Sequence, residues 1–185
     1  MIGLFQARRS LARAAARTFQ AMNTKDISAH LAGIFSELTA GAKGGANFVL
    51  NGGDPGLLAA LDGLSAAEAS VAVRDGATVA AHAEHLRFSL SLMNRWAIEG
   101  GNPFANAAWY QAWEVRAVDV DRWTAIRAAL RKEVQAWQEV LRSPREVLPI
   151  ELGGMLGSVV HLAYHLGAMR QMQPGLRGPK DESKR

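Results

Sequence analysis

The sequence predicts an all-α protein, a four-helix bundle with an extra helical arm at its amino-terminal end. Three observations predict this fold. Four long segments repeat apolar residues at spacings of three and four, the period of an amphipathic helix. No segment of the sequence sustains the apolar–polar alternation typical of a strand, and two connections are long. We therefore divide the chain into a basic arm at 1–22, a bundle at 23–173 and a flexible tail at 174–185.

The surplus positive charge of the chain is concentrated in the arm. Residues 1–22 contain four arginines and no acid, and removing these four from 21 lysines and arginines leaves 17, equal to the 17 aspartates and glutamates. A body without surplus positive charge is atypical of a nucleic-acid-binding groove, so we expect no nucleic-acid partner. The arm has the composition of an organellar transit peptide, but an ordinary amphipathic helix, or a natural start at Met22, explains it better.

The sequence contains no cysteine. This excludes disulfides, thiolate metal sites, iron–sulfur clusters and a cysteine nucleophile. The longest stretch without a charged residue, 152–169, is long enough for a membrane span, but its two histidines and four glycines favour a buried helix. With no secretory signal evident, we expect a cytoplasmic protein without a membrane partner.

The first long helix is predicted at 26–39. Five apolar residues fall on one face of it: Ile27, Leu31, Ile34, Phe35 and Leu38. Asn23 or Thr24 can cap its first turn. Residues 41–56 are rich in glycine and end in a strong turn signal, and their apolar residues 48–50 indicate a packed connection.

A short helix and the second long helix follow. Ser65 and Glu68 have the spacing of a capping box, which starts a short helix. The second long helix is predicted at 78–99, where a pair of glycines ends it. On a helical wheel, His82 and His85 both lie on its apolar side.

The second half of the chain predicts two more long helices. Residues 107–113 form a less regular, tryptophan-containing stretch. Asp121 can cap a third long helix that extends to 141, and Ser143 with Pro144 stops it. The fourth is predicted at 148–172. We expect most of the five tryptophans to be core residues.

The histidines are the most informative polar residues. His161 and His165 lie four positions apart, so both imidazoles share one helical face and can reach one ion. Either His82 or His85 could supply a third ligand from another helix. Small residues at 154, 157 and 158 leave room above the pair for a ligand or water. Two buried imidazoles each need a polar partner; protein groups can supply it, and so can a metal ion.

Two of these segments resemble the DinB-like family of four-helix-bundle proteins. Residues 161–171, HLAYHLGAMRQ, are similar to the family's last-helix signature, in which His-x-x-x-His-x-Gly precedes a residue pair containing arginine. Residues 82–88, HAEHLRF, resemble its second-helix segment, and residues 47–61 and 109–123 look like its connecting segments. The resemblance covers about 22–173.

The resemblance implies an up-and-down four-helix bundle with unusual connectivity, often dimeric, with a site for nickel or zinc. On this pattern His85, His161 and His165 are the metal ligands. The chain departs from it at Ala168, where many relatives carry glutamine, and at His82, which offers a competing ligand.

Two classes of function are compatible with such a site, an enzyme and a non-catalytic binding protein. Three imidazoles leave coordination positions open, which is typical of catalytic metal sites. The resemblance implies either a metal-dependent hydrolase or a low-molecular-weight-thiol transferase, with a small-molecule substrate. The alternative is a non-catalytic small-ligand or metal-binding protein of a stress response, because no general base is evident.

We expect Glu84 to pair with Arg87, Tyr164 to be a packing residue, and Glu151 to interact with the start of its helix.

Overall fold

The computed structural model describes residues 21–43 and 46–176. Within these ranges the chain is mostly helical, with seven α-helices, a short 3-10 helix and one sheet of two short strands. The predicted all-α class is confirmed. The predicted arm helix lies almost entirely outside the described residues. No helix in these ranges combines the length and the hydropathy needed to cross a bilayer.

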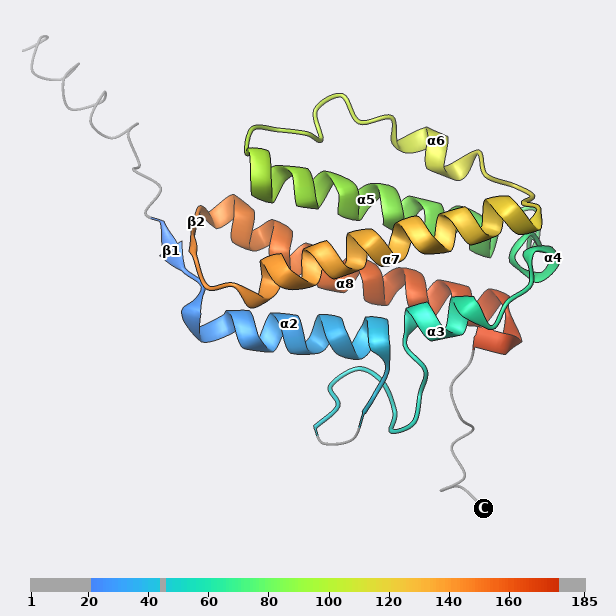
Figure 1. The fold of residues 1–185 in the computed structure, drawn as a ribbon, viewed down its shortest axis with the longest axis horizontal. Coiled ribbons are helices and arrows are strands. Elements are labelled where there is room, and N and C mark those ends of the chain that lie inside the picture. Colours follow the sequence, from blue (N-terminus) through green and yellow to red (C-terminus); the bar gives the residue numbers. More distant parts are fainter. Residues whose placement is uncertain (1–20, 44–45, 177–185) are drawn as a thin grey trace, which may run out of the picture.

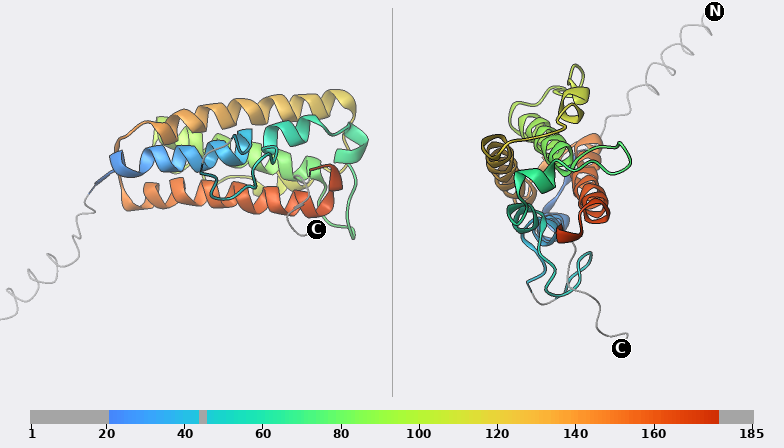
Figure 2. Two further views of the ribbon diagram at one scale, coloured as in Figure 1. Left: turned by 90° about the horizontal axis from the view of Figure 1, so that it is seen from below. Right: turned by 90° about the vertical axis from the view of Figure 1, so that its right-hand side faces the viewer.

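Four long helices form the body of the molecule: α2 (Lys25–Ala40), α5 (Val79–Glu99), α7 (Val120–Arg142) and α8 (Pro149–Met172). They lie lengthwise around one core in the spatial order α2, α7, α5, α8, so that α2 lies diagonally opposite α5 (Figures 1 and 2). α2 and α8 run in one direction, and α5 and α7 in the other (Figure 1). The connectivity is therefore unusual: α5 and α7 run in the same direction, because the long connection between them returns along the molecule.

The predicted apolar stripes face the core. The stripe of α7 is buried along its whole length: Ile126, Leu130, Val134, Trp137 and Leu141. In α2, Leu31, Phe35 and Leu38 are buried, whereas Ile27 and Ile34 pack against the core at its edge. Burying one such side chain contributes about 1.5–3 kcal/mol, so these stripes position the helices.

The helix starts differ in part from the predicted caps. Asp119, not Asp121, caps α7: its Oδ1 accepts the N–H of Arg122 at 2.7 Å, and its backbone is extended. Asp121 lies inside the first turn, where its charge suits the helix dipole. Thr24 precedes α2 but makes no capping hydrogen bond; its hydroxyl donates to the carbonyl of Arg145 instead.

Two short elements lie at the ends of the predicted bundle. Met22, assigned to the arm, belongs to β1 (Met22–Asn23), which pairs antiparallel with β2 (Glu146–Val147). The 3-10 helix η1 (Pro174–Leu176) lies in the predicted flexible tail, yet Leu176 is fully buried. Strand pairing therefore holds Met22, whose side chain is exposed, and burial in the core holds Leu176.

Three short helices complete the fold: α3 (Leu57–Asp62), α4 (Ala66–Ala69) and α6 (Trp109–Trp113). The predicted capping box is confirmed at α4. Ser65 Oγ accepts the N–H of Glu68 at 3.2 Å, and Glu68 Oε2 accepts the N–H of Ser65 at 2.9 Å.

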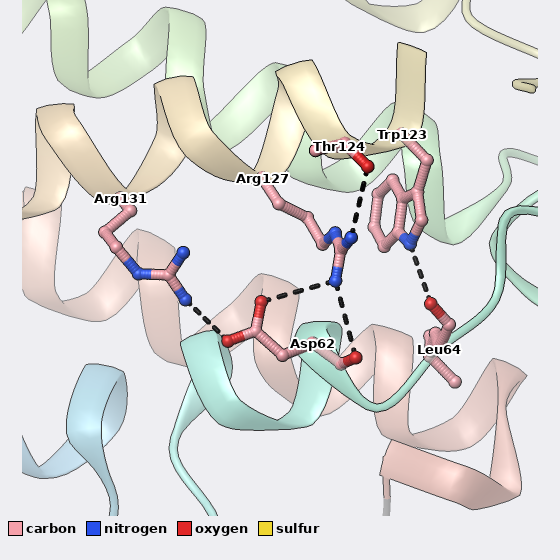
Figure 3. A network of polar contacts seen from close by, with 6 residues as sticks. All are labelled: Asp62, Leu64, Trp123, Thr124, Arg127 and Arg131. Atoms are coloured by element: carbon pink, nitrogen blue, oxygen red, sulfur yellow. Dashed lines mark hydrogen bonds and ion pairs between the residues drawn. The ribbon is translucent and has the colours of Figure 1, made fainter. Parts of the chain in front are cut away.

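A polar network fastens α3 to α7 (Figure 3). The Asp62 carboxylate pairs with the guanidinium groups of Arg127 and Arg131. Beside it, the indole N–H of Trp123 donates to the carbonyl of Leu64 at 2.8 Å. The indole is fully buried, so this bond satisfies a donor that would otherwise be costly.

The connection after α2 is held by a carboxylate and by burial of Leu50, as expected for that residue. Glu37 accepts the backbone N–H groups of Phe48, Val49 and Leu50. Phe48 is 71% exposed and Val49 50%, so the expected apolar packing is wrong for both. Burial opposes ionisation of Glu37, but the three N–H donors outweigh it and lower the pKa of Glu37.

Candidate metal centre

Two helices bring four histidines together. α5 contributes His82 and His85, and α8 contributes His161 and His165. The two helices are antiparallel, since His85 contacts His161 while Trp96, further along α5, lies against Gly154, earlier in α8. His82, His85 and His165 are buried, and His161 is half-buried.

Three of the imidazoles converge on one point. The Nε2 atom of His161 lies 3.1 Å from Nε2 of His85 and 2.9 Å from Nε2 of His165. One ring nitrogen from each residue lies within 4.8 Å of the others, so the cluster could hold a metal ion. The structure thus brings together His85, His161 and His165, the three residues that the sequence singled out.

Hydrogen bonds between the rings leave the cluster incompletely satisfied. A ring nitrogen has one in-plane position, which either carries a proton or accepts one. His161 Nε2 therefore cannot form full hydrogen bonds with both His85 and His165. A cation at the centre uses all three lone pairs, and tetrahedral zinc ligands at about 2.0–2.1 Å from the ion lie about 3.4 Å apart, close to the observed separations. The residues fit a divalent ion.

His82 lies behind the cluster rather than in it. Its Nδ1 atom is 2.8 Å from Nδ1 of His165, on the side of that ring away from Nε2. With His165 Nε2 directed at an ion, its Nδ1–H can donate to His82, the arrangement that commonly orients a metal-bound imidazole. Of the two residues left open by the sequence, His85 therefore lies in the three-histidine cluster, and His82 lies behind it as a support for His165.

Replacing His82 with alanine should weaken metal affinity without emptying the site. Loss of such a supporting partner lowers affinity by about 10–100-fold. Competition with a chromophoric chelator measures the change, and His82→Gln, which retains an acceptor, should recover part of it. Complete loss of the bound ion in His82→Ala would instead identify His82 as a ligand.

The environment keeps the imidazoles neutral, as metal ligation requires. Burial, and next the nearby His161 and His82, lower the pKa of His85 to about 4. Burial, followed by the charges of the other three histidines, lowers the pKa of His165 to about 3. Burial also lowers the pKa values of His82 and His161. Little proton competition therefore opposes metal binding near neutral pH.

The metal-free protein should lose stability on mild acidification. The unfolded chain binds protons below the ordinary histidine pKa of 6.5, whereas folded His85 resists protonation down to about 4, so falling pH favours unfolding across this window. The urea concentration at the unfolding midpoint of chelator-treated protein should be lower at about pH 5 than at about pH 7.5. Both pH values lie above the usual carboxylate pKa values. His165→Leu should reduce the fall; an unchanged or higher midpoint at the lower pH in the unaltered chain would contradict it.

The cluster borders a pocket of about 900 Å³ between α5, α8 and the segment 100–109. His85 and His161 line one end of it. A Cβ built on Gly157 would meet no atom within 4 Å, so this glycine leaves the expected room. At Gly154 the expectation is wrong, because a Cβ there would lie 2.5 Å from the ring of Trp96, which fills that space.

The other candidate residues take varied roles. Glu84 pairs with Arg87 at 2.9 Å, as predicted. Glu151 Oε2 accepts the N–H of Leu148 at 2.6 Å at the start of α8, also as predicted, and it lines the pocket as well. Tyr164 is 70% exposed, so its expected packing role is wrong.

The aromatic residues divide between the core and the site. Trp123 and Trp137 are core residues, whereas Trp96 and Trp109 line the pocket and Trp113 stacks on His85 with centroids 4.4 Å apart. Sequence reasoning did not single out Ser89, whose Oγ lies 3.5 Å from Nδ1 of His161. Its position four residues after His85 was the available signal, since that spacing puts it on the same face.

Comparisons with known proteins identify no relative. No family model matches the chain, and searches of curated proteins and of solved structures give no significant match. Function therefore has to be inferred from the site itself.

Proposed function

We propose that His85, His161 and His165 bind one divalent ion, zinc or nickel, and that the protein is a metal-dependent hydrolase of small molecules. One observation carries the proposal: three neutral imidazoles from two helices converge where a pocket of about 900 Å³ ends. Three such ligands leave coordination positions for water and substrate, which a purely structural site does not need.

The residues around the ion have distinct tasks. A divalent ion supplies Lewis acidity, which polarises a carbonyl group and acidifies water. Nδ1 of His82 accepts a hydrogen bond from the Nδ1–H of His165 and thereby fixes the orientation of that ring. Ser89 is placed to do the same for His161. Trp113 packs on the face of His85 and limits its movement.

The resemblance to DinB-like proteins supports the same ligand set. The proposal includes that family's four-helix-bundle fold, supported by four long helices around one core with the two histidine segments on neighbouring helices. The thiol-transferase alternative rests on the resemblance alone.

The test is hydrolysis by protein loaded with zinc or nickel, compared with chelator-treated protein, on a panel of esters, amides and thiol conjugates. Turnover that requires the ion and disappears in His161→Ala supports the hydrolase. Equal turnover with and without metal would reject it.

One observation favours a non-catalytic binding protein as the second candidate. The only carboxylate among the described residues that line the pocket, Glu151, is already engaged by the N–H of Leu148. Stoichiometric metal binding without turnover of any substrate in the panel would support this candidate.

A further inference from the structure

The pocket beside the histidines has a continuous aromatic wall. Trp96 and Phe104 meet edge to face with centroids 5.4 Å apart, and Phe104 is parallel to Trp109 within 4°. The Trp109 ring lies 5.8 Å from that of His85. The wall therefore extends from the start of α8 to the imidazole cluster.

The dimensions of the pocket favour an elongated ligand. Trp96 lies eleven residues after His85 on α5, so the two are about 16 Å apart along the helix axis at about 1.5 Å per residue. A volume of about 900 Å³ is at the upper end of small-molecule pockets. Two or three fused or linked rings fit this space.

Away from the histidine end, where the proposed ion binds, the charges of the pocket disfavour an anionic ligand. Apart from the two histidines, Glu151 is the only ionisable residue among the described residues that line it, and no lysine or arginine does. The start of α8 would attract an anion through its free N–H groups. Glu151 already accepts one of these, from Leu148, and its negative charge opposes a second anion there.

We propose that this pocket takes an uncharged, elongated aromatic molecule, and that the substrate is a neutral aryl ester or amide. Its carbonyl lies at the histidines and its rings lie along Trp96, Phe104 and Trp109. The identification of this ligand as a substrate rests on the proposed hydrolase function. A ligand with a charged group beside Trp96, Phe104 or Trp109 would place that charge against a wall without a cation, which is costly.

The reaction itself fits this preference. Water adds to the acyl carbon and the C–O or C–N bond breaks. The oxygen of the water stays on the acyl group, and one of its protons passes to the leaving alcohol or amine. The acid product then ionises by releasing its own proton to solvent, so the charge that forms lies at the acyl group beside the histidines and not along the aromatic wall.

A matched pair of fluorescent probes tests the ligand class without turnover. N-phenylnaphthylamine is neutral, and anilinonaphthalene sulfonate has the same rings with one negative charge. On full-length, chelator-treated protein, the neutral probe should bind at least about tenfold more tightly, a difference of about 1.4 kcal/mol. Equal affinities, or tighter binding of the sulfonate, would overturn the proposal.

Two glycine variants locate the probe. Gly157 lines the pocket, whereas Gly153, one turn away on α8, does not, and a Cβ on either meets no atom within 4 Å. Gly157→Leu should therefore weaken the neutral probe by about tenfold or more, and Gly153→Leu should leave it unchanged. Equal effects of the two variants would place the probe elsewhere and overturn the assignment.

A variant that removes the charge of Glu151, and a comparison of zinc-loaded with metal-free protein, separate the two proposals. Glu151→Gln keeps an acceptor for Leu148 and removes the negative charge, so it should reduce the ratio of neutral-probe to sulfonate affinity severalfold; an unchanged ratio would contradict the charge argument. An uncharged naphthyl hydroxamate should bind more tightly to zinc-loaded than to metal-free protein. If no ion binds but the neutral probe stays preferred, the hydrolase fails while the ligand class stands. If the ion binds but probe preference is absent, the ligand class fails alone.

Discussion

Replacing His161 with alanine should abolish stoichiometric binding of zinc or nickel. The Nε2 atom of His161 is the shared neighbour of His85 and His165, at 3.1 and 2.9 Å. Without it, only two of the three proposed ligands remain, and they lie on different helices. The loss of metal affinity should therefore exceed the roughly 100-fold loss expected for a supporting residue. Elemental analysis after desalting should change from about one ion per chain to none, and chelator competition should quantify the change.

The fifth histidine provides the control. His30 is exposed on α2 and takes no part in the cluster, so His30→Ala should retain the full metal content. Circular dichroism should show unchanged helix content in both variants. A His161→Ala protein that still binds one ion with native affinity would refute the site.

Replacing Gly56 with alanine should have the largest effect on stability outside the metal centre. A Cβ at this position would overlap the backbone nitrogens of Ala40 and Gly41, at the end of α2. Backbone atoms at a helix end cannot move aside as a flexible side chain can. The backbone of Gly56, with φ −72° and ψ 171°, suits alanine, so the penalty is steric alone. We expect a loss of about 3 kcal/mol or more.

Gly52 is the matched control in the same connection. A Cβ there meets no atom within 4 Å, so Gly52→Ala should change stability by less than about 0.5 kcal/mol. Urea unfolding of the two variants measures the difference as a shift in midpoint at constant slope. Similar midpoints for both variants would contradict the prediction, because they would show that the backbone at the end of α2 moves to accommodate the added Cβ.

Local patterns predicted the helices well because each pattern depends on neighbours in the sequence. The α7 stripe from Ile126 to Leu141 needed only the helical period, and the box of Ser65 and Glu68 only a fixed spacing. The cap of α7 was harder, since Asp119 and Asp121 both offer a carboxylate and only the backbone conformation decides between them.

Tertiary relationships were less accessible to the sequence. Helix direction is not encoded in periodicity, so the parallel course of α5 and α7 could not be predicted. His82 and His85 share an apolar face, and only the placement of α8 determines which one meets His161. The role of Gly154 was misjudged for the same reason, because the side chain that fills its space, Trp96, comes from another helix.

The distance in sequence between the two halves of the cluster has a consequence for durability. His85 and His161 are 76 positions apart, so an ion between them closes a long loop in a chain that has no cysteine for a covalent clasp. An ion that binds only the folded chain stabilises it by RT ln(1 + [ion]/Kd), which is about 2.7 kcal/mol when the free ion concentration is about one hundred times Kd. With the proposed ion bound, resistance to heat and proteolysis should therefore rise and fall with the supply of that ion.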